Sequence, residues 1–348
     1  MTQLVKWHES QHWQVNLGTT DIDCCTYGGY APISAFEPML NYLNALLRKP
    51  TLTGGLEHEL AIMNNERTDQ GWSSGQVDSM KIRYKALYRD NQIVSWLVNG
   101  SDLNELTIED AQAFHRQYYD CPNMTIIMVG GLPEAEAVSM VMRAFPLSTT
   151  TVARPVRQEP RMLINPRPRT NIIRKTGDQR KRSNNPLSVT LSWFWIVPPG
   201  GDDAIQVTID CLEQLFEERI REKWTLNYGA STEFASHEDH RRVEIETTVS
   251  PDYEHRVRRL FIHTLRDADA VVAELPERKA AYRRSHDVYD PDVQTTLESA
   301  VNDLVSKNHI RTLAESIAAY EAVTEHDVRR VLAEILCPER YFLEVEET

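Results

Sequence analysis

The sequence has few cysteines, no long apolar run and no excess of basic charge, and each absence argues against a class of protein. Its five cysteines form no CxxC pair, which fits reduced thiols better than a disulfide framework or a thiolate zinc site. No stretch approaches the roughly 18 consecutive apolar residues of a membrane-spanning helix. The first residues, MTQLVKWHES, have no basic segment followed by an apolar one, so no signal peptide is expected. Together these features predict a cytoplasmic protein.

Acidic residues outnumber basic ones, 51 to 38, and the formal net charge is −13 at pH 7. This charge disfavours binding to nucleic acid or to anionic membranes and makes cationic partners more plausible. One segment differs, because ten basic residues and two acidic ones lie between Arg154 and Arg182. No aromatic residues are interleaved with them, so we interpret this segment as a solvated linker. Neither nucleic acid nor a membrane is an expected partner.

The length of 348 residues predicts two units of about 150 to 190 residues each. We place an N-terminal domain at 1–150, a basic and proline-rich linker with a possible short strand near TNIIRK at 151–185, and a C-terminal domain at 186–348. The segments LTIEDAQAFHRQYYDCPNMTIIMVGG and VTEHDVRRVLAEILCPERYFLEVE share one pattern, a threonine-capped helix followed by a strand. An internal duplication is the simplest explanation.

Apolar periodicity predicts the elements of both halves. The first half is expected to hold strands within 13–29, a helix ending before Pro50, a helix over 59–66, a helical region at 74–97, a helix from Thr107 with an apolar stripe, a buried strand at 124–131 and a helix at 133–145. The second half is expected to hold a strand at 186–198, a helix at 204–224, a hairpin at 227–250, helices at 252–269 and 276–287, a long helical region at 291–321, a helix from Thr324 and a strand at 341–346.

The octet ELAIMNNE places two carboxylates, Glu59 and Glu66, on one stripe of a helix. Seven residues are close to two helical turns, so both side chains project from the same face. A solvated surface face is one interpretation, and a metal ligand with a supporting carboxylate is the other. The spacing alone does not choose between them.

Four motifs carry a resemblance to the pitrilysin/insulinase family of zinc metallopeptidases and their inactive relatives. LTIEDAQAFHRQYYDCPNMTIIMVGGLPEAEAV resembles the segment that closes the family's first half-domain. NLGTTDIDCCTY resembles the strand that lines the substrate edge, although Leu17 stands where alanine is usual. ELAIMNNE resembles the family's Glu-Arg-x-x-Val-x-x-Glu helix, and REKWTLNYGAS its Arg-Glu-Lys-x-Gly-Leu-x-Tyr segment. The resemblance extends over nearly the whole chain.

The resemblance implies an α+β fold, an α/β sandwich of two homologous half-domains, each a mostly antiparallel sheet packed with helices. It also implies roles for five residues. Glu66 matches the family's zinc-binding glutamate and Glu59 the supporting acid, while Asn16, Arg221 and Tyr228 match substrate-contacting positions. In the family the remaining zinc ligands are the histidines of an HxxEH helix, whose glutamate accepts a proton from the zinc-bound water.

No HxxEH is present in this chain, and the register places that helix upstream of Met1. The first half-domain is therefore expected to be N-terminally truncated. Glu66 alone cannot hold zinc, so we expect no catalytic residue and no cofactor, unless a partner or a missing N-terminal segment supplies HxxEH.

Other histidine patterns do not replace the missing motif. HESQH matches the HExxH pattern of other zinc peptidases, which binds metal on a helix, where both histidines share one face. Alignment with the family places His12 at the start of a strand, so the side chains of His8 and His12 should point in different directions. His237 and His240 are expected at a hairpin turn. His58 and His115 lie on expected helix surfaces without any ligand pattern.

Three functions remain open. The first is a catalytically silent subunit that binds peptide, scaffolds a partner peptidase, or both. The second is a fragment or late-start form of an active zinc metalloendopeptidase, and the third is a purely structural subunit of a larger assembly. An incomplete first sheet would favour a capping partner, either a catalytic pitrilysin-like subunit or a second copy. Any bound substrate is expected to be an unfolded peptide added as a strand along 13–27.

Overall fold

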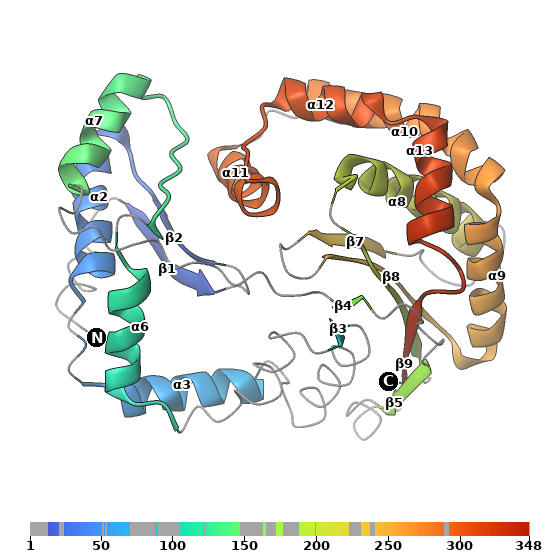
Figure 1. Ribbon diagram of the computed structural model, residues 1–348, viewed down its shortest axis with the longest axis horizontal. Coiled ribbons are helices and arrows are strands. Elements are labelled where there is room, and N and C mark those ends of the chain that lie inside the picture. The colour runs from blue at the N-terminus through green and yellow to red at the C-terminus, as the bar shows by residue number, and fades with distance from the viewer. Residues whose placement is uncertain are drawn as a thin grey trace. The chain divides into compact units, whose positions relative to one another are not determined.

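The computed structural model describes residues 13–20, 24–50, 52, 54–69, 88–89, 105–120, 123–146, 163–164, 172–176, 188–198, 200–222, 231–236, 241–288 and 292–347 (Figure 1). The chain divides into two compact units. Unit 1 comprises Met1–Ser73, Asn99–Glu159 and Asp292–Val305, and unit 2 comprises Ser74–Val98, Pro160–Pro291 and Ser306–Thr348. Among the described helices, none has the length and apolar character needed to cross a bilayer.

A β-hairpin packed under two helices forms the core of unit 1. The predicted strands are present as β1 (Gln14–Thr20) and β2 (Cys25–Tyr30), which pair antiparallel. Helices α2 (Ile33–Arg48) and α7 (Glu134–Ala144) confirm two further predictions. The buried side chains of this core are Trp13, Val15, Met39, Leu40, Tyr42, Leu43, Ala144 and Phe145. The helical spacing of apolar residues in α2 therefore identified its buried face correctly.

Helix α6 (Ile108–Tyr118) begins with the predicted cap. The Thr107 hydroxyl accepts a hydrogen bond from the Asp110 backbone N–H, and the Asp110 carboxylate accepts one from the Thr107 N–H, which completes a capping box. The predicted apolar stripe, however, is not buried. No residue of α6 is buried, and Phe114 is 53% exposed. Helix α6 is thus stabilised by its cap more than by burial of an apolar face.

The buried strand predicted at 124–131 is not formed. Residues 124–129 have no regular secondary structure, and Ile126 is 40% exposed. The reason is the lack of a partner, since a strand requires a neighbouring edge to receive its backbone hydrogen bonds. In the described part of unit 1, β1 and β2 pair only with each other. This apolar segment with a strand-like sequence therefore pairs with none of the described strands.

Unit 2 holds a five-stranded sheet in the order β5-β9-β6-β8-β7. Its strands are β5 (Ile172–Thr176), β6 (Val189–Ile196), β7 (Ser231–Ser236), β8 (Arg241–Val249) and β9 (Phe342–Glu347). Only β5 and β9 pair in parallel, so the predicted mostly antiparallel sheet is confirmed here. The strand expected near TNIIRK, inside the predicted linker, is β5. It adds an edge strand to this sheet.

Short strands β3 (Tyr88–Arg89) and β4 (Leu163–Ile164) pair antiparallel with each other. The first of these lies in the region expected to be helical at 74–97, so the helical interpretation is wrong at these two residues. The rest of that region lies outside the described residues.

The helices of unit 2 follow the expected order. They are α8 (Asp202–Phe216), with the π-helical turn η4 (Glu217–Glu222), the short η5 (Pro251–Tyr253), α9 (Glu254–Arg266), α10 (Ala268–Val288), α12 (Leu313–Ala322) and α13 (Glu325–Arg330), with the π-helical turn η6 (Val331–Ile335). Thr324 caps α13 as predicted.

The long helical region expected at 291–321 is two helices, α11 (Val293–Lys307) and α12. Asn308 breaks the chain direction with a φ of 53°, a left-handed conformation that ends helices. Thr312 then starts α12 with a capping box closed by Glu315. The turn chemistry of these residues outweighed their helical periodicity.

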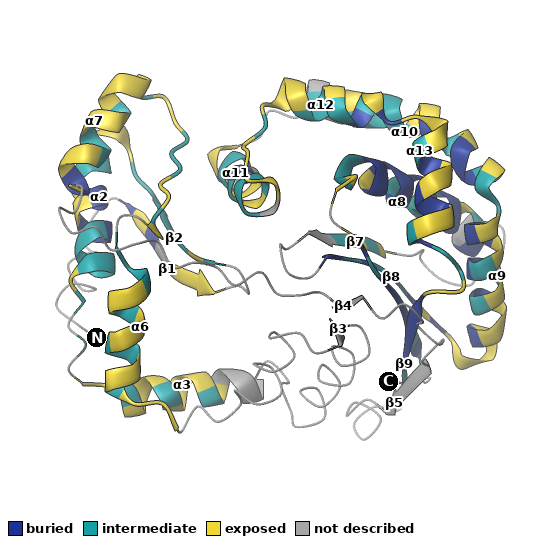
Figure 2. Ribbon diagram, viewed as in Figure 1, coloured by how far each residue is buried: buried dark blue, intermediate teal, exposed yellow. Residues whose placement is uncertain are grey.

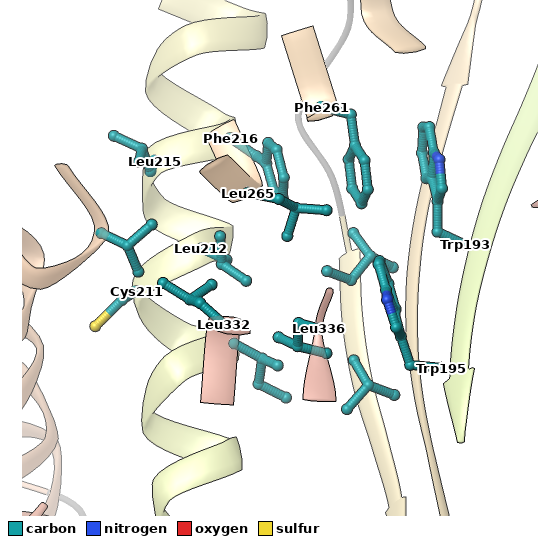
Figure 3. Close-up of a cluster of buried hydrophobic side chains, with 14 of the residues drawn as sticks. Trp193, Trp195, Cys211, Leu212, Leu215, Phe216, Phe261, Leu265, Leu332 and Leu336 are labelled. Atoms are coloured by element: carbon teal, nitrogen blue, oxygen red, sulfur yellow. The ribbon is translucent and has the colours of Figure 1, made fainter. Parts of the chain in front are cut away.

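The core of unit 2 lies between the sheet and α8, α9 and α13 (Figure 3). Strand β6 lies between β9 and β8, and its side chains are mostly apolar and buried. The Trp193 ring stacks on Phe261 of α9 at a centroid distance of 3.8 Å, and Phe261 stacks on Phe216 of α8 at 4.8 Å. These three rings join the sheet to two helices.

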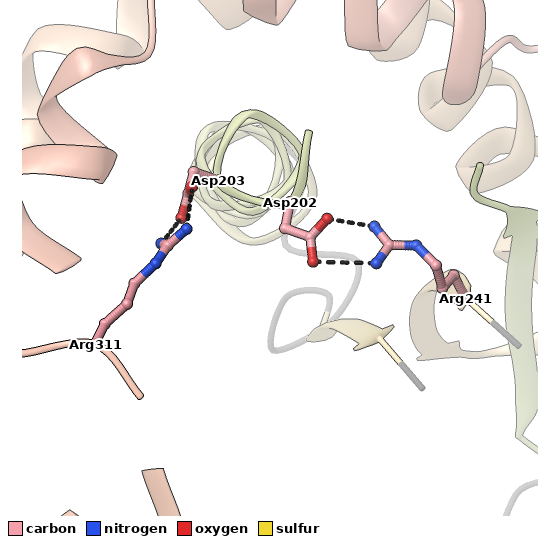
Figure 4. Close-up of polar contacts among 4 residues, drawn as sticks. All are labelled: Asp202, Asp203, Arg241 and Arg311. Atoms are coloured by element: carbon pink, nitrogen blue, oxygen red, sulfur yellow. Dashed lines mark hydrogen bonds and ion pairs between the residues drawn. The ribbon is translucent and has the colours of Figure 1, made fainter. Parts of the chain in front are cut away.

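Two ion pairs hold the first turn of α8 (Figure 4). The Arg241 guanidinium, only 6% exposed, donates two hydrogen bonds to the Asp202 carboxylate. Arg311 donates to both oxygens of Asp203, at 2.6 and 3.1 Å. Two acids in the first turn also complement the helix dipole. The start of α8 is thereby tied to β8 and to the segment that precedes α12.

Removing the central ring of the stack should destabilise unit 2. We expect Phe261→Ala to lower the free energy of unfolding by about 3 to 5 kcal/mol, because it leaves a cavity between two buried rings. Urea unfolding followed by tryptophan fluorescence measures the effect. The matched control is Phe114→Ala, whose ring is largely exposed and whose loss should change stability by less than about 0.5 kcal/mol. Equal losses in both variants would contradict this account of the core.

Candidate functional site

The carboxylates singled out in the sequence lie on α3 (Leu56–Asp69), so the predicted helix is confirmed. Glu59 and Glu66 are seven positions apart on it, which places them on one face. The Glu59 side chain is exposed, whereas the side chain of Glu66 lies outside the described residues. Between them, Ile62 is 37% and Met63 43% exposed. The described part of α3 is therefore a lightly packed helix with an accessible acidic and apolar surface.

The residues around α3 do not fit the zinc site that the family resemblance implies. Nowhere in the described ranges do three or more His, Cys, Asp or Glu side chains lie close enough together to hold a metal ion. A zinc ion in a protein requires three or four such ligands. The ligand role of Glu66 and the supporting role of Glu59 stay predictions that only an additional set of donors could complete. HESQH at 8–12 and the pair His237 and His240 lie outside the described residues.

The hairpin of unit 1 holds the expected substrate edge. Asn16 of β1 lies opposite Gly28 of β2, and a β-bulge follows between Asn16 and Thr19. The bulge requires Gly18, whose φ is 123° and where a Cβ would lie 2.6 Å from the Tyr27 ring. The side chain of Asn16 is not among those described, so its contact with substrate stays a prediction. Each strand of the hairpin has one edge that no other described strand covers.

An aromatic cluster ties this hairpin to α6 and α2. The Tyr27 and Tyr119 hydroxyls are 2.6 Å apart and share a hydrogen bond. Burial, followed by this hydrogen bond, raises the pKa of Tyr119. The His115 ring stacks on Tyr119 at 4.9 Å, and its Nε2 lies 2.7 Å from the Leu47 carbonyl oxygen. His115 therefore has a structural role between two helices, which the sequence did not reveal.

The second half carries the other two predicted substrate residues. Arg221 lies in the turn η4, directly after α8, and Tyr228 lies outside the described residues. The side chain of Arg221 is likewise not described. Its neighbour Arg219 is held by hydrogen bonds to Thr264 and Asp267, at 3.0 and 2.7 Å. This anchors the backbone before Arg221 to the end of α9.

One feature of the fold was missed at the sequence level. Helix α9 carries arginines and histidines along its outer side, and they line an open groove in unit 2. The signal was present in HRVRRLFIHTLR, where basic residues recur at helical spacing between apolar ones. This pattern predicts a helix but not a groove, because amphipathic surface helices commonly carry such charges.

Known proteins are similar to this chain in sequence over one segment and in fold over nearly its whole length. The family model for the peptidase M16 inactive domain matches residues 105–271. This segment, just under half of the chain, is similar to the peptidase M16 inactive domain. M16 peptidases are the pitrilysin-like family, so the resemblance drawn from the four motifs is confirmed. The matched residues extend from the cap of α6 to the start of α10, and thus include all of α9.

Solved structures confirm the α+β fold of the M16 domain. A protease from Helicobacter pylori has a TM-score of 0.76 and 15% identity, over 99% of this chain and 83% of that one. A peptidase M16 inactive domain from Pseudomonas fluorescens has a TM-score of 0.73 and 16% identity, over 99% of this chain and 82% of that one. The first half of the periplasmic protease PqqL from Escherichia coli has a TM-score of 0.67 and 13% identity, over 96% of this chain and 75% of that one. No curated protein matches the chain in sequence.

Zinc analysis tests whether the α3 carboxylates form a metal site within this chain. After incubation with zinc and desalting, we expect far less than one zinc ion per chain, and no change on Glu59→Gln or Glu66→Gln, because isolated carboxylates bind zinc weakly. Elemental analysis by mass spectrometry provides the measurement. One zinc ion per chain that is lost on Glu66→Gln would show that the chain completes the site by itself.

Proposed function

We propose that this M16 chain is a non-catalytic subunit that associates through unit 1 with a catalytic M16-like chain and contributes to peptide binding. The distribution of exposed apolar side chains carries the proposal. Among the described residues, twelve large apolar side chains are exposed, and nine of them belong to unit 1. These nine are Ile33, Ile62, Met63, Leu106, Phe114, Ile126, Val138, Met142 and Val293.

Exposed apolar side chains gathered in one unit favour association. Each square ångström of apolar surface removed from water contributes about 25 cal/mol, and monomeric proteins rarely expose large contiguous apolar patches. Val138 and Met142 lie four residues apart on α7, so they extend from one helix face. Ile126 belongs to the segment 124–129, which pairs with no described strand and could receive a strand from another chain. Figure 2 shows that the described parts of α3, α6 and α7 are largely exposed.

A catalytic M16-like chain suits this surface better than a second copy. A second copy would add the same incomplete set of metal ligands, so a self-dimer would still have no described metal site. A catalytic relative would carry HxxEH and could use the substrate-contacting residues of this chain. In this proposal those residues are Arg221, Tyr228 and Asn16, and the substrate is an unfolded peptide bound along the edge of the β1–β2 hairpin.

The cytoplasm is the proposed compartment. Cys24, Cys25, Cys211 and Cys337 form no disulfide among themselves, and reducing compartments keep cysteines in the thiol state. The Escherichia coli structure is that of a periplasmic protease, so fractionation of cells is the direct measurement.

Association through unit 1 is tested with two matched isoleucines. Ile126 in unit 1 is 40% exposed and Ile310 in unit 2 is 41% exposed. We expect Ile126→Asp to weaken binding to a co-expressed catalytic M16-like chain from the same genome by about tenfold or more, about 1.4 kcal/mol. Ile310→Asp should leave that affinity unchanged. Analytical ultracentrifugation measures both affinities and the mass of the chain alone.

Two results would overturn the association proposed here. The first is a stable self-dimer that excludes the catalytic chain. The second is equal weakening by both substitutions, which would mean that unit 1 is not the contact surface.

Peptide binding is tested in the reconstituted pair. The double variant Arg221→Ala with Tyr228→Phe should raise KM for an unfolded peptide by about tenfold with little change in kcat, because these side chains are proposed to bind substrate and not to react with it. Ultracentrifugation confirms that the pair still forms. Unchanged KM would remove the substrate-binding role, and equal cleavage with and without this chain would favour a purely structural subunit. Cleavage by this chain alone would instead favour an active peptidase.

A further inference from the structure

Helix α9 borders an open groove of about 1030 Å³ in unit 2. We define the basic groove by six of its lining residues, which are His255, Arg258, Arg259, His263, Arg266 and Tyr341. Five of these six residues carry basic side chains, and all five come from a single helix. The groove lies far along the sequence from the carboxylates of α3 and has no part in the roles assigned above.

The fold determines which side of α9 faces this groove. Val257, Phe261 and Leu265 are buried in the core, where Phe261 stacks between Trp193 and Phe216. Because a helix turns 100° per residue, this buried stripe, which also includes Thr264, leaves the opposite side of α9 facing away from the core. His255, Arg259, His263 and Arg266 are on this side and are exposed. The stacked rings therefore hold the basic row in a constant orientation.

Neighbouring acids neutralise this row only in part. Arg258 forms an ion pair with Glu254 at 3.2 Å, and Arg266 forms one with Glu339 at 2.8 Å. Asp267, the acid that lines the groove, is paired with Arg219. None of the described carboxylates forms an ion pair with Arg259, whose side chain is exposed. Positive charge thus remains on this helix in a chain with a net charge of −13.

We propose that the basic groove binds an acidic peptide segment, rich in aspartate and glutamate, from a substrate or partner protein. The guanidinium groups of Arg259 and Arg266 match carboxylates, because each presents a planar fork of N–H donors to two oxygens. The row from His255 to Arg266 spans eleven residue steps, about 16 Å at 1.5 Å per residue. An extended peptide covers this distance with about five residues, whereas a single small anion would contact only one end of the row.

Two observations favour an acidic peptide over nucleic acid. Tyr341, the aromatic residue that lines the groove, is only 9% exposed, so it offers no open face for stacking of bases. The net charge of −13 also repels a long polyanion such as a nucleic acid. A short acidic segment carries few charges and meets mainly the local positive field of α9. The negative net charge of the whole chain favours cationic partners, whereas the local positive charge of this groove favours an acidic one.

The experiment uses the full chain without any partner, so its result does not depend on the proposed function. Fluorescence polarisation measures binding of a labelled hexapeptide rich in glutamate and aspartate. We expect the affinity for this peptide to fall steeply with added salt, because the contacts are charged and exposed. The first comparison peptide has each acid replaced by its amide, and the second probe is a single-stranded oligonucleotide of six nucleotides.

Two substitutions test the groove itself, and a matched control accompanies them. Arg266→Gln should weaken binding of the acidic peptide about fivefold to tenfold, as should Arg259→Gln, which breaks no described ion pair. Arg284→Gln is the control, because Arg284 of α10 is 61% exposed and pairs with Glu277 at 2.6 Å, while Arg266 is 62% exposed and pairs with Glu339 at 2.8 Å. The control should leave the affinity unchanged, and circular dichroism verifies that all three variants fold.

The outcomes separate the alternatives. Equal binding of the amide peptide would show that charge plays no part and would overturn the proposal. Equal weakening by Arg284→Gln would show that any surface arginine serves, which also overturns it. Tighter binding of the oligonucleotide, lost on Arg266→Gln, would assign the groove to nucleic acid. Selective binding of the acidic peptide, lost on Arg259→Gln and Arg266→Gln only, supports the groove as its site.

Discussion

The stacking of Phe261 between Trp193 and Phe216 is the contact on which the arrangement of unit 2 depends. It brings together a central strand and two helices that are widely separated in sequence. Large stacked rings restrict how these elements can rotate, because the interior is close-packed and few other orientations avoid voids. The orientation of α9, and with it the direction of its basic row, follows from this contact. A buried apolar cluster thereby positions a charged surface.

The two halves of the chain show how one sequence pattern leads to different structures. Both contain a threonine-capped helix followed by a strand-like segment, and both caps form as capping boxes, at Thr107 and Thr324. In the second half the following segment becomes β9, hydrogen-bonded between β5 and β6. In the first half residues 124–129 find no described strand to pair with. Local capping is decided by a few neighbouring residues, whereas strand formation requires a partner edge.

Metal binding, like strand pairing, depends on groups that come from distant parts of the chain. A zinc site of this family needs imidazoles and a carboxylate brought together from separate helices. The chain has a helix, α3, with acids at the positions that the resemblance predicts, and in the described residues no further donors gather around them. A carboxylate on a helix face is then available to solvent or to a partner chain. The same unit also exposes apolar side chains, which is the observation behind the proposed partner chain.

The sequence alone determined the identity and order of most elements. Apolar periodicity identified the buried face of α2, threonine caps located the starts of α6 and α13, and four motifs indicated a resemblance to the M16 family. These features are local, so a short window of residues contains all the interactions that decide them. The candidate carboxylates Glu59 and Glu66 were found in the same way, from spacing within a single helix.

Only the tertiary structure decided which residues of these elements are buried, exposed or in contact with one another. It showed that Phe114 and Ile126 are exposed although their segments look like buried ones, and that the region at 291–321 breaks at Asn308. It also showed that His115 stacks on Tyr119 and that α9 turns a basic row outward. Burial, pairing and the shape of a groove depend on which distant segments meet. That information resides in the packing of the whole chain and in no single stretch of residues.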